Sequence, residues 1–546
     1  MIKSEITESI KNILSDISKD GFWIITGAAM VMHGIKTQTS DIDIGCTREV
    51  FQELINKGYS VIKEEGYPDR IQIDGCVEVL KEVKISKIEK IEGIPVASIA
   101  DIVKFKKRLD RKKDRKDLAL IMNHQQHIEL RQKRFYDIIN YCKKNIPYYK
   151  QYLKDMIPKE DACITLDKLP VVDKQEYMEN QAMFLSNELS MDNLIWEFTS
   201  GSTGQPLKIC KSKEERIIQG WMLQTQRREN GLDIGNCIMI RFHNFVNTFD
   251  NESTDILMEP TIANNQIYFP VLFFNNKNVS KLCELLKSYD TAWFYGTPSQ
   301  IYKICNLLND VDFPINKITY IELFGEVLFK HQKELIQSIF TCPIRNMYGC
   351  HEIWAIAYEC SCGNLHILEN NVILEILDEE GKGVGYNQEG EIVLTSLIQK
   401  SMPFIRYKIG DRGKIKKSEC LCGRTSDVLE LSAARVADDI VMEDGRRISS
   451  IVFLHILMLV NQDRILIKQF QIYQRNFKKF EIFIVPSIEN DKKNIESIFK
   501  KVLFDVLKEN VELEFIYRDD IVVNSKSGKV KYFFPLESEI QMRSEK

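Results

Sequence analysis

The sequence predicts a multidomain α/β protein. Its 546 residues exceed what a single hydrophobic core usually supports, so about two to four domains are expected. Between residues 237 and 308, strand-like runs alternate with helical runs, a pattern that favours a parallel sheet with crossover helices. Residues 1–125 differ, because short strands follow one opening helix there.

Composition places the chain among ordinary globular proteins. Hydrophobic residues make up 44%, charged residues 28%, and the net charge of -4 gives no global attraction to nucleic acid or anionic membrane. The first residues lack the apolar core of a signal peptide, and no window of about eighteen residues is uninterruptedly apolar. We therefore expect a cytoplasmic protein with no membrane partner. Its 14 cysteines are too sparse for a disulfide scaffold, so clustered ones favour metal binding.

The first segment begins with an amphipathic helix and continues into short strands. Apolar residues at helical spacing occupy residues 2–17 and stop at Gly21. Residues 22–26 are expected to form a strand, residues 27–34 a tight turn and short helix, and residues 40–44 a second strand.

Two aspartates in the second strand indicate a metal site. Asp41 and Asp43 alternate with apolar residues, so both side chains are expected on one face of the strand. Like charges on one face repel unless a cation lies between them, which favours a divalent metal. Residues 70–80 are expected to form a neighbouring strand that presents Glu78, completing a two-metal cluster for a nucleoside triphosphate. The alternative is a pair of solvated aspartates at a strand end.

A glycine turn, a DxD strand and a later strand acid together resemble the small nucleotidyltransferase fold. Residues 98–121, which include Lys106, Lys113, Asp114 and Asp117, are similar to the closing helix of that family. The resemblance implies nucleotide binding by Gly27, Asp41, Asp43 and Glu78. Ala28 stands where the family usually has Gly or Ser, and its third acid is usually Asp, so a domain without catalysis that regulates or docks is the alternative.

The run of Lys and Arg over residues 104–116 is interpreted as a solvated helix surface with a contact to triphosphate. Nucleic acid is the least favoured partner, because no aromatic residues interleave with the charges. Residues 123–127 are polar and without periodicity, so they are the expected join between modules. Residues 128–152 then form a long helical pattern that breaks at Pro147.

A run rich in Gly, Ser and Thr over residues 198–208 (FTSGSTGQPLK) predicts a phosphate-binding loop. Glycines let backbone N–H groups face an anion, hydroxyls add donors, and Lys208 adds a positive charge. The candidate phosphate ligands are Thr199, Ser200, Gly201, Ser202, Thr203, Gly204 and Lys208. A flexible connector is the alternative interpretation of such a run.

Six further motifs follow this loop in chain order. They are residues 323–326 (LFGE), 347–352 (MYGCHE), 403–411 (PFIRYKIGD), 420–424 (CLCGR), 434–438 (ARVAD) and 525–529 (SKSGK). Their order and spacing resemble the adenylate-forming superfamily, and the CLCGR element resembles its phenylacetate–CoA ligase/CapK-like branch. The resemblance covers roughly residues 130–546.

The resemblance implies a nucleotide site. Tyr348 and Gly349 would wall the adenine, Asp411 would accept both ribose hydroxyls, and Arg435 would contact the nucleotide. Turns that include Gly325 and Glu326 line the acyl and adenine pockets in this superfamily.

Catalytic roles are implied in the same way. Glu352 would hold magnesium against the ATP phosphates, and His351 stands where many relatives carry Thr. Lys529 matches the lysine that reaches the carboxylate and the α-phosphate, where its charge would stabilise the transition state. Asp438 matches the hinge of a small mobile domain, and Ala434 replaces the Gly usual before Arg435.

The cysteine pairs indicate a structural zinc site. Two CxC pairs and a nearby histidine offer enough thiol and imidazole ligands for tetrahedral zinc. The resemblance selects Cys360, His366, Cys420 and Cys422 and leaves Cys362 as a spare. Reduced cysteines packed in turns are the alternative.

The resemblance also implies the domain layout and the reaction. Residues 1–125 would be the nucleotidyltransferase-like α+β domain, residues 128–430 a large α/β domain with the zinc site, and residues 431–546 a small α+β domain. The expected reaction activates a carboxylic acid with ATP as acyl-AMP, then transfers the acyl group to CoA or a carrier thiol. Transfer of AMP to a small-molecule hydroxyl is the alternative.

The identity of the acid is weakly indicated. Trp293, Phe294, Phe324 and Trp354 lie near the pocket-forming motifs and suggest an aromatic or otherwise apolar acyl group. Aromatic residues near a sheet are more often part of the core.

Overall fold

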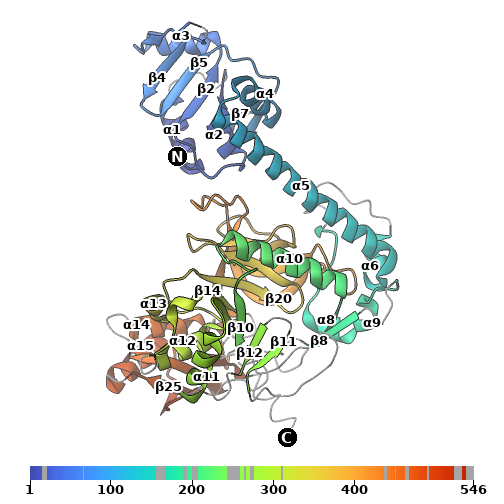
Figure 1. The fold of residues 1–546 in the computed structure, drawn as a ribbon, viewed down its shortest axis with the longest axis vertical. Helices are drawn as coiled ribbons and strands as arrows, with labels where there is room; N and C mark the ends of the chain where they lie inside the picture. The colour runs from blue at the N-terminus through green and yellow to red at the C-terminus, as the bar shows by residue number, and fades with distance from the viewer. Residues whose placement is uncertain are drawn as a thin grey trace. The chain divides into compact units, whose positions relative to one another are not determined.

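In the computed structural model the chain forms two compact units, residues 1–133 with 417–428 and residues 134–416 with 429–546. The structure describes residues 1–536 except residues 15–20, 66, 155–165, 189–193, 199–206, 243–258, 264–265, 271–275, 309–311, 436–439, 445, 449, 461–465, 488–490 and 522–531. Both units combine helices with mixed sheets, as the sequence predicted (Figure 1). In the described ranges no helix has both the length and the apolar character needed to cross a membrane.

The first unit is built around a seven-stranded mixed sheet with the order β3-β4-β5-β2-β1-β7-β6. Its elements are α1 (Lys3–Leu14), β1 (Phe22–Ile25), α2 (Thr26–Met32), β2 (Ile42–Cys46), α3 (Arg48–Asn56), β3 (Val61–Ile62), β4 (Arg70–Asp74), β5 (Val77–Lys81), β6 (Ile88–Ile91), β7 (Ile94–Ala97) and α4 (Ile99–Leu109). Alternation places Ile42 and Ile44 of β2 in the core, which leaves Asp43 between them on the opposite face.

The strand expected over residues 70–80 is instead a hairpin of β4 and β5. The Asp74 carboxylate accepts hydrogen bonds from the backbone N–H groups of Cys76 and Val77, at 3.2 and 3.1 Å. Asp followed by Gly75 favours such a turn, and this signal was missed within an alternating pattern. The neighbouring strand that presents Glu78 is therefore β5, which pairs in parallel with β2.

Helix α5 (Lys112–Asn145) is continuous through residues 123–127, where a join between modules was expected (Figure 1). The polar composition of this segment misled the prediction, because a helix exposed on most sides needs no apolar stripe. The break expected at Pro147 is present, since α6 (Pro147–Leu153) begins there with the proline in its first turn.

The second unit contains a twelve-stranded sheet. The elements before and within it are α8 (Lys174–Glu179), α9 (Gln181–Phe184), β8 (Leu194–Phe198), β9 (Lys208–Ser212), α10 (Lys213–Glu229), β10 (Ile238–Phe242), β11 (Thr261–Ala263), β12 (Gln266–Phe269), α11 (Asn276–Lys287), β13 (Ala292–Gly296), α12 (Pro298–Leu307), η3 (Ile315–Lys317), β14 (Ile318–Phe324), α13 (Lys330–Ile339), β15 (Ile344–Cys350), β16 (Trp354–Glu359), β17 (Leu365–Ile367), β18 (Val372–Leu377), β19 (Gly390–Ser396), β20 (Tyr407–Lys416) and β21 (Val428–Arg435).

Five neighbouring strands of this sheet are parallel, which confirms the prediction from alternating strands and helices. Their order is β12-β10-β13-β14-β15, so the chain lays down β10 first, adds β12 on one side and then adds the other three on the opposite side. This is the 2-1-3-4-5 order of doubly wound sheets, in which ligands bind at the carboxyl ends of the strands beside the switch in direction. That switch lies between β10 and β13.

The two faces of the parallel strands are covered differently. Ile240, Phe294 and other alternate residues pack against α11, α12 and α13 in one apolar cluster. On the opposite face, Arg227 of α10 donates two hydrogen bonds to Glu322 of β14, at 2.8 and 2.6 Å. Both side chains are buried, and the Tyr358 hydroxyl donates to the same carboxylate at 2.5 Å. This pair fixes α10 to the sheet.

Residues 440–534 form a further apolar core around a four-stranded sheet with the order β26-β25-β24-β27. The elements are β22 (Ile440–Val441), β23 (Arg447–Ile448), α14 (Ile451–Val460), β24 (Ile467–Asn476), β25 (Lys479–Pro486), α15 (Lys492–Leu507), β26 (Glu512–Tyr517) and β27 (Phe533–Phe534). This arrangement is the α+β architecture that the resemblance implied for the C-terminal segment.

The buried pair yields a stability prediction. Glu322→Gln should lower the free energy of unfolding of the second unit by about 3 to 5 kcal/mol, because it leaves the Arg227 charge buried without a counter-charge. Urea unfolding followed by tryptophan fluorescence measures this change.

Removing both charges with Arg227→Met and Glu322→Gln together should recover much of the loss. Glu334→Gln is the matched control, since its pair with Lys330 is exposed and 3.7 Å long, and it should leave the midpoint unchanged. Equal midpoints for Glu322→Gln and the control would contradict the role assigned to the buried pair.

Candidate functional site

The predicted phosphate loop connects the two strands of the hairpin β8–β9, and Thr199, Ser200, Gly201, Ser202, Thr203 and Gly204 lie outside the described residues. Lys208 pairs with Phe198 where the loop returns to the hairpin. Its ammonium group lies 4.5 Å from the centre of the Trp196 ring, a contact that holds a positive charge beside the loop.

Tyr348 and Asp411 are brought together from distant motifs. The Tyr348 hydroxyl on β15 donates to the Asp411 carboxylate on β20 at 2.8 Å. The resemblance assigned Tyr348 to the adenine wall and Asp411 to the ribose contact. One bound nucleoside could contact both only if the two residues lie close together, as they do here. Gly349 is required by packing, because a Cβ there would lie 2.2 Å from the carbonyl oxygen of Trp354.

The turn between β15 and β16 carries His351 and Glu352. The Glu352 side chain is only 8% exposed, and its carboxylate accepts a hydrogen bond from the Tyr407 hydroxyl at 2.9 Å. Burial and then the charge of Glu352 raise the pKa of Tyr407, so Tyr407 remains a neutral donor that orients the carboxylate. An oriented carboxylate is a suitable oxygen ligand for magnesium.

A buried lysine supports the same turn. Lys211 of β9 is fully buried and donates to the carbonyl oxygen of His351 at 2.5 Å, while the Glu197 carboxylate lies 3.8 Å away. Burial lowers the pKa of Lys211, and Glu197 partly restores it. The sequence analysis missed Lys211 and Tyr407, because neither partner can be inferred from local spacing.

Gly325 and Glu326 follow the end of β14. Gly325 has a φ of +75°, a left-handed conformation that favours glycine at this tight turn. The Glu326 carboxylate accepts from the backbone N–H of Ser299 at the start of α12, at 3.1 Å. The contact ties together two strand-to-helix turns at the carboxyl edge of the sheet.

Three predicted residues are placed only in part or not at all. Strand β21 ends at Arg435, whose side chain lies outside what the structure describes. Asp438 and Lys529 both fall in segments outside the described residues.

The four predicted zinc ligands are divided between the two units. Cys360 and His366, both buried, belong to the second unit, and Cys420 and Cys422 belong to residues 417–428 of the first. Cys420 is also buried, whereas the spare Cys362 is exposed. Three thiols and one imidazole fit a tetrahedral zinc whose positions are all filled by protein.

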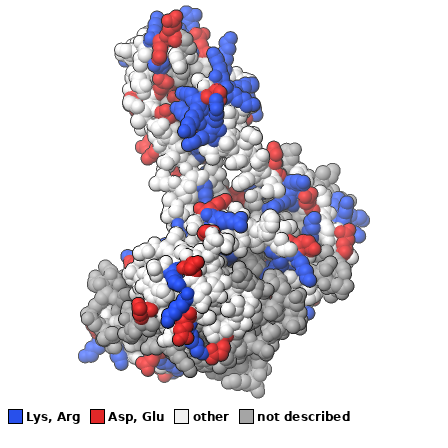
Figure 2. All heavy atoms as spheres, viewed as in Figure 1, with Lys and Arg blue, Asp and Glu red and all other residues white. Residues whose placement is uncertain are grey.

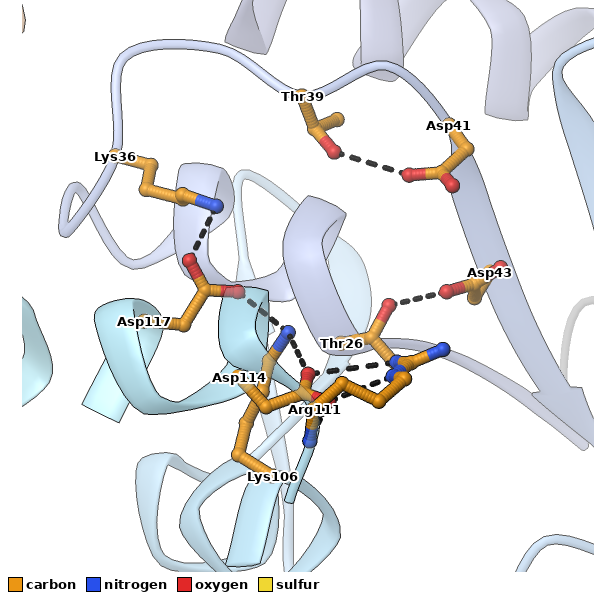
Figure 3. A network of polar contacts seen from close by, with 9 residues as sticks. All are labelled: Thr26, Lys36, Thr39, Asp41, Asp43, Lys106, Arg111, Asp114 and Asp117. Carbon is orange, nitrogen blue, oxygen red and sulfur yellow. Dashed lines mark hydrogen bonds and ion pairs between the residues drawn. The ribbon is translucent and has the colours of Figure 1, made fainter. Parts of the chain in front are cut away.

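In the first unit, three carboxylates influence one another. Asp43 of β2 is in register with Glu78 of β5, and Asp41 precedes β2. Burial raises the pKa of Asp43 and the charge of Asp41 raises it further, although the Thr26 hydroxyl donates to the Asp43 carboxylate (Figure 3). Burial and the charge of Asp43 likewise raise the pKa of Glu78, although Arg70, 3.0 Å from its carboxylate, lowers it. These shifts favour a cation as the missing partner.

The backbone beside Asp43 is strained. Thr26 has a φ of +55°, which is rare for a β-branched residue. Strain of this kind is found at functional sites, and here it directs a hydroxyl to the aspartate. Gly27 is closely packed, because a Cβ there would lie 2.8 Å from the Thr39 hydroxyl oxygen.

Beside the carboxylates lies a buried ion network. The Lys106 ammonium group contacts Asp114 at 3.2 Å and Asp117 at 2.6 Å, and Arg111 contacts Asp114 at 2.7 Å (Figure 3). Although burial opposes ionisation, hydrogen bonds from Arg111 and Lys106 lower the pKa of Asp114 to about 2. The network joins the end of α4 to the start of α5.

Apart from Lys106, the basic side chains of residues 104–116 are exposed. Lys and Arg gather on the face of the first unit seen in Figure 2. Residues 104–116 supply eight exposed Lys and Arg side chains and a single exposed acid, Asp110. Asp110 pairs with Arg115, so most of the positive charge is not neutralised by acids of the same segment.

Comparison with known proteins finds two relatives, of which one is named as a CoA ligase, although no family model matches the chain. Protein CapK from Staphylococcus aureus is 20% identical over 426 residues, covering 74% of this chain and 88% of CapK. Phenylacetate-coenzyme A ligase from Thermus thermophilus is 32% identical over 85 residues, 15% of this chain and 19% of that protein.

A crystal structure of 2-hydroxyisobutyryl-CoA ligase, in the postadenylation state with R3-HIB-AMP, has the same fold. It superposes with a TM-score of 0.58 at 16% identity, covering 76% of this chain and 92% of the ligase.

The predicted zinc ligands yield a metal prediction. Elemental analysis should find about one zinc per chain, because the ligand set fills one tetrahedral shell. Cys420→Ser should lose the zinc and lower the melting temperature, since binding of a structural metal contributes to folding.

Cys362→Ser is the matched control, and it should keep both the zinc and the melting temperature. Metal-free wild-type protein that melts at the same temperature as the zinc-loaded form would exclude a structural zinc.

Proposed function

From the adenylate-forming ligase fold and from relatives that include a CoA ligase, we propose that this protein is an ATP-dependent acid–thiol ligase that releases AMP. It activates a carboxylic acid as acyl-AMP and transfers the acyl group to CoA or a carrier thiol. The observation that carries the proposal is the 2.8 Å hydrogen bond between Tyr348 and Asp411, the residues assigned to adenine and ribose.

The first step forms the mixed anhydride. A carboxylate oxygen attacks the α-phosphorus of ATP, the bond to the bridging oxygen breaks, and pyrophosphate leaves with its electron pair. Tyr348, Gly349, Asp411 and Arg435 hold the adenosine. Residues 199–204 with Lys208 hold the phosphates, and Lys529 supplies charge to the transition state.

The second step transfers the acyl group. The thiol sulfur attacks the acyl carbon, the thiol proton is released, and AMP leaves as the anhydride bond breaks. A small domain that rotates near Asp438 would exchange Lys529 for a thiol-access surface, as in conformational steps of other enzymes.

Side chains around Glu352 prepare it for magnesium. Tyr407 orients its carboxylate, and Lys211 fixes the preceding carbonyl, so the turn is held before ATP binds. Bound magnesium would neutralise phosphate charge, and His351 would supply a polar contact from the same turn. A zinc held by Cys360, His366, Cys420 and Cys422 would be structural, because protein atoms would fill its shell.

The acyl group of the acid is proposed to contact aromatic rings. Trp293 and Phe294 are core residues, at 3% and 0% exposure, whereas Phe324 and Trp354 are half-buried beside the turns. An apolar or aromatic part of the acyl group would lie against the latter two.

We place the reaction in the cytoplasm, because the described cysteines form no disulfide and the co-substrates are ATP and CoA.

The first unit offers a second candidate function, metal-dependent binding of a nucleoside triphosphate. The observation that favours it is the in-register pair Asp43 and Glu78, with Asp41 close enough to raise the pKa of both. Transfer of AMP to a hydroxyl would follow where these acids hold catalytic metals. Without metals, the unit serves as a regulatory or docking module.

Lys529→Ala tests the ligase. It should lower acid-dependent ATP–pyrophosphate exchange by about 100-fold or more, since one charge directed at a transition state contributes about 3 kcal/mol. ATP affinity by titration calorimetry should change little. Lys526→Ala, three residues away in the same segment, is the control and should keep the exchange rate.

An unchanged rate in Lys529→Ala would remove this lysine from the mechanism. AMP transfer to a hydroxyl that persists in Lys529→Ala would favour the first unit as its source.

Asp41→Asn with Asp43→Asn tests the first unit in the full chain. Every variant in this binding test also carries Asp411→Ala, which weakens the nucleotide site of the ligase. The protein with Asp411→Ala alone is called the parent. The parent should bind a nucleoside triphosphate only with magnesium or manganese, and the added substitutions should abolish this binding by removing the charges that the metal requires.

Asp69→Asn in the same parent is the control, because Asp69 pairs with Lys81 instead. In the chain with Asp411 intact, carboxylate activation should survive the Asp41 and Asp43 changes. A parent that never binds the triphosphate, or acid variants that still bind it, would identify a module without catalysis.

A further inference from the structure

Arg241 is a half-buried cation for which the described residues supply no acidic partner. It is the penultimate residue of β10, and its guanidinium carbon lies 5.4 Å from the centre of the Tyr295 ring and 5.8 Å from that of Tyr268. Its Nε atom is buried and has no hydrogen-bond acceptor among the described residues. No carboxylate of the described residues forms an ion pair with Arg241.

The neighbouring arginines are paired. Arg216 of α10 contacts Glu197 at 2.9 Å and lies over the Trp354 ring at 3.9 Å. Arg227 donates one hydrogen bond to each carboxylate oxygen of Glu322. Burial lowers the pKa of Arg216, Glu197 opposes this, and the charge of Arg241 lowers it again, so the two guanidinium groups repel each other. The described acids therefore leave one positive charge uncompensated.

An uncompensated cation in this position is costly. Aromatic faces contribute about 1 to 2 kcal/mol to a partly desolvated guanidinium, less than the several kcal/mol lost on removing the charge from water. Two tyrosines and a repelling arginine thus do not account for Arg241, and an anionic ligand would.

The position of Arg241 in the sheet indicates which ligand. Arg241 is in register with Tyr268 of β12 and Tyr295 of β13, at the carboxyl ends of strands beside the switch point of the doubly wound order. Tyr348 is on β15, three strands away from β10. At about 4.8 Å per strand, Arg241 lies roughly 14 Å from the strand that bears the adenine contact. It is therefore far from the adenosine.

We propose that Arg241 binds a second anionic group of the acid, so that the substrate is a dicarboxylic acid or an acid with another oxyanion. The inference rests on the proposed ligase function and names its substrate class. The reacting carboxylate must reach the α-phosphorus, which leaves Arg241 for the opposite end of the acid. Tyr295, stacked on Phe324 at 4.2 Å, would line the space between the two ends.

The test compares matched acids in ATP–pyrophosphate exchange. Succinate is paired with butyrate, glutarate with valerate, and terephthalate with 4-methylbenzoate. Wild-type protein should use at least one dicarboxylate with a kcat/KM about 100-fold above its partner, because a site built for a charged group rejects an analogue that leaves the site unpaired.

Two substitutions at Arg241 test its role. Arg241→Met should shift that ratio by about 100-fold toward the monocarboxylate, and Arg241→Lys should retain part of the preference. Succinate, glutarate or terephthalate should also raise the melting temperature of wild-type protein and not that of Arg241→Met, a readout that needs no turnover. Where Arg241→Met does not fold, Arg241→Gln and Arg241→Lys are compared with the wild type in its place.

Arg475→Met is the matched control. Arg475 also lies over a tyrosine, at 4.7 Å from the centre of the Tyr473 ring, but belongs to the sheet of residues 440–534. It should keep the wild-type ratio. Exchange that prefers monocarboxylates, or a ratio that is the same in wild-type and Arg241 variants, overturns this inference and leaves the ligase proposal intact. If none of these acids supports ATP–pyrophosphate exchange, both this inference and the ligase proposal are overturned.

Discussion

The buried pair between Arg227 and Glu322 is the interaction on which the arrangement of the second unit depends. It joins the C-terminal half of α10 to β14, one of the five parallel strands. Tyr358 and Tyr320 extend it as a chain of hydrogen bonds, with 2.9 Å between their hydroxyl oxygens. Such a network is stable only when every member is satisfied, so it specifies one position for α10.

The other end of α10 passes this constraint to the candidate active site. Gln219 donates to the carbonyl oxygen of Ile353 at 3.0 Å, and Lys211, in the strand before the helix, donates to that of His351. Glu215 accepts from Ser401 through both backbone and side chain. The turn that bears Glu352 is thus held from α10 and β9, and the charges that hold it are themselves buried. A rigid turn of this kind lets the carboxylate meet magnesium without reorganisation.

Local periodicity was sufficient to predict the alternation of strands and helices over residues 237–308 and the parallel sheet. It was insufficient at Asp74, where an Asp-Gly turn interrupts an alternating run, and at residues 123–127, where polarity was interpreted as a join between modules. The choice of zinc ligands came from resemblance to a family rather than from spacing, since CxC pairs alone do not indicate which thiol is spare.

Partners that come from distant parts of the chain could not be predicted. Lys211, Tyr407 and Thr26 gain their importance from a carbonyl, a carboxylate and a strained backbone that no local pattern encodes. Arg241 appears in the sequence as one residue of an ordinary strand. That the described residues give Arg241 no counter-charge becomes visible only when the acids around it are seen to be already paired.

Among the described residues, both units leave charge only partly compensated at the places where ligands are expected, with opposite sign. In the first, Asp43 and Glu78 repel Asp41 and one another. Glu78 is paired with Arg70 at 3.0 Å, while the buried Lys106 is committed to Asp114 and Asp117. In the second, Arg241 faces two tyrosines and a repelling arginine. Burial of an unpaired charge opposes folding, so its persistence is more economically explained by a ligand than by stability. The first arrangement calls for a cation and the second for an anion, and a metal–nucleotide complex and a dicarboxylic acid are ligands of those two kinds.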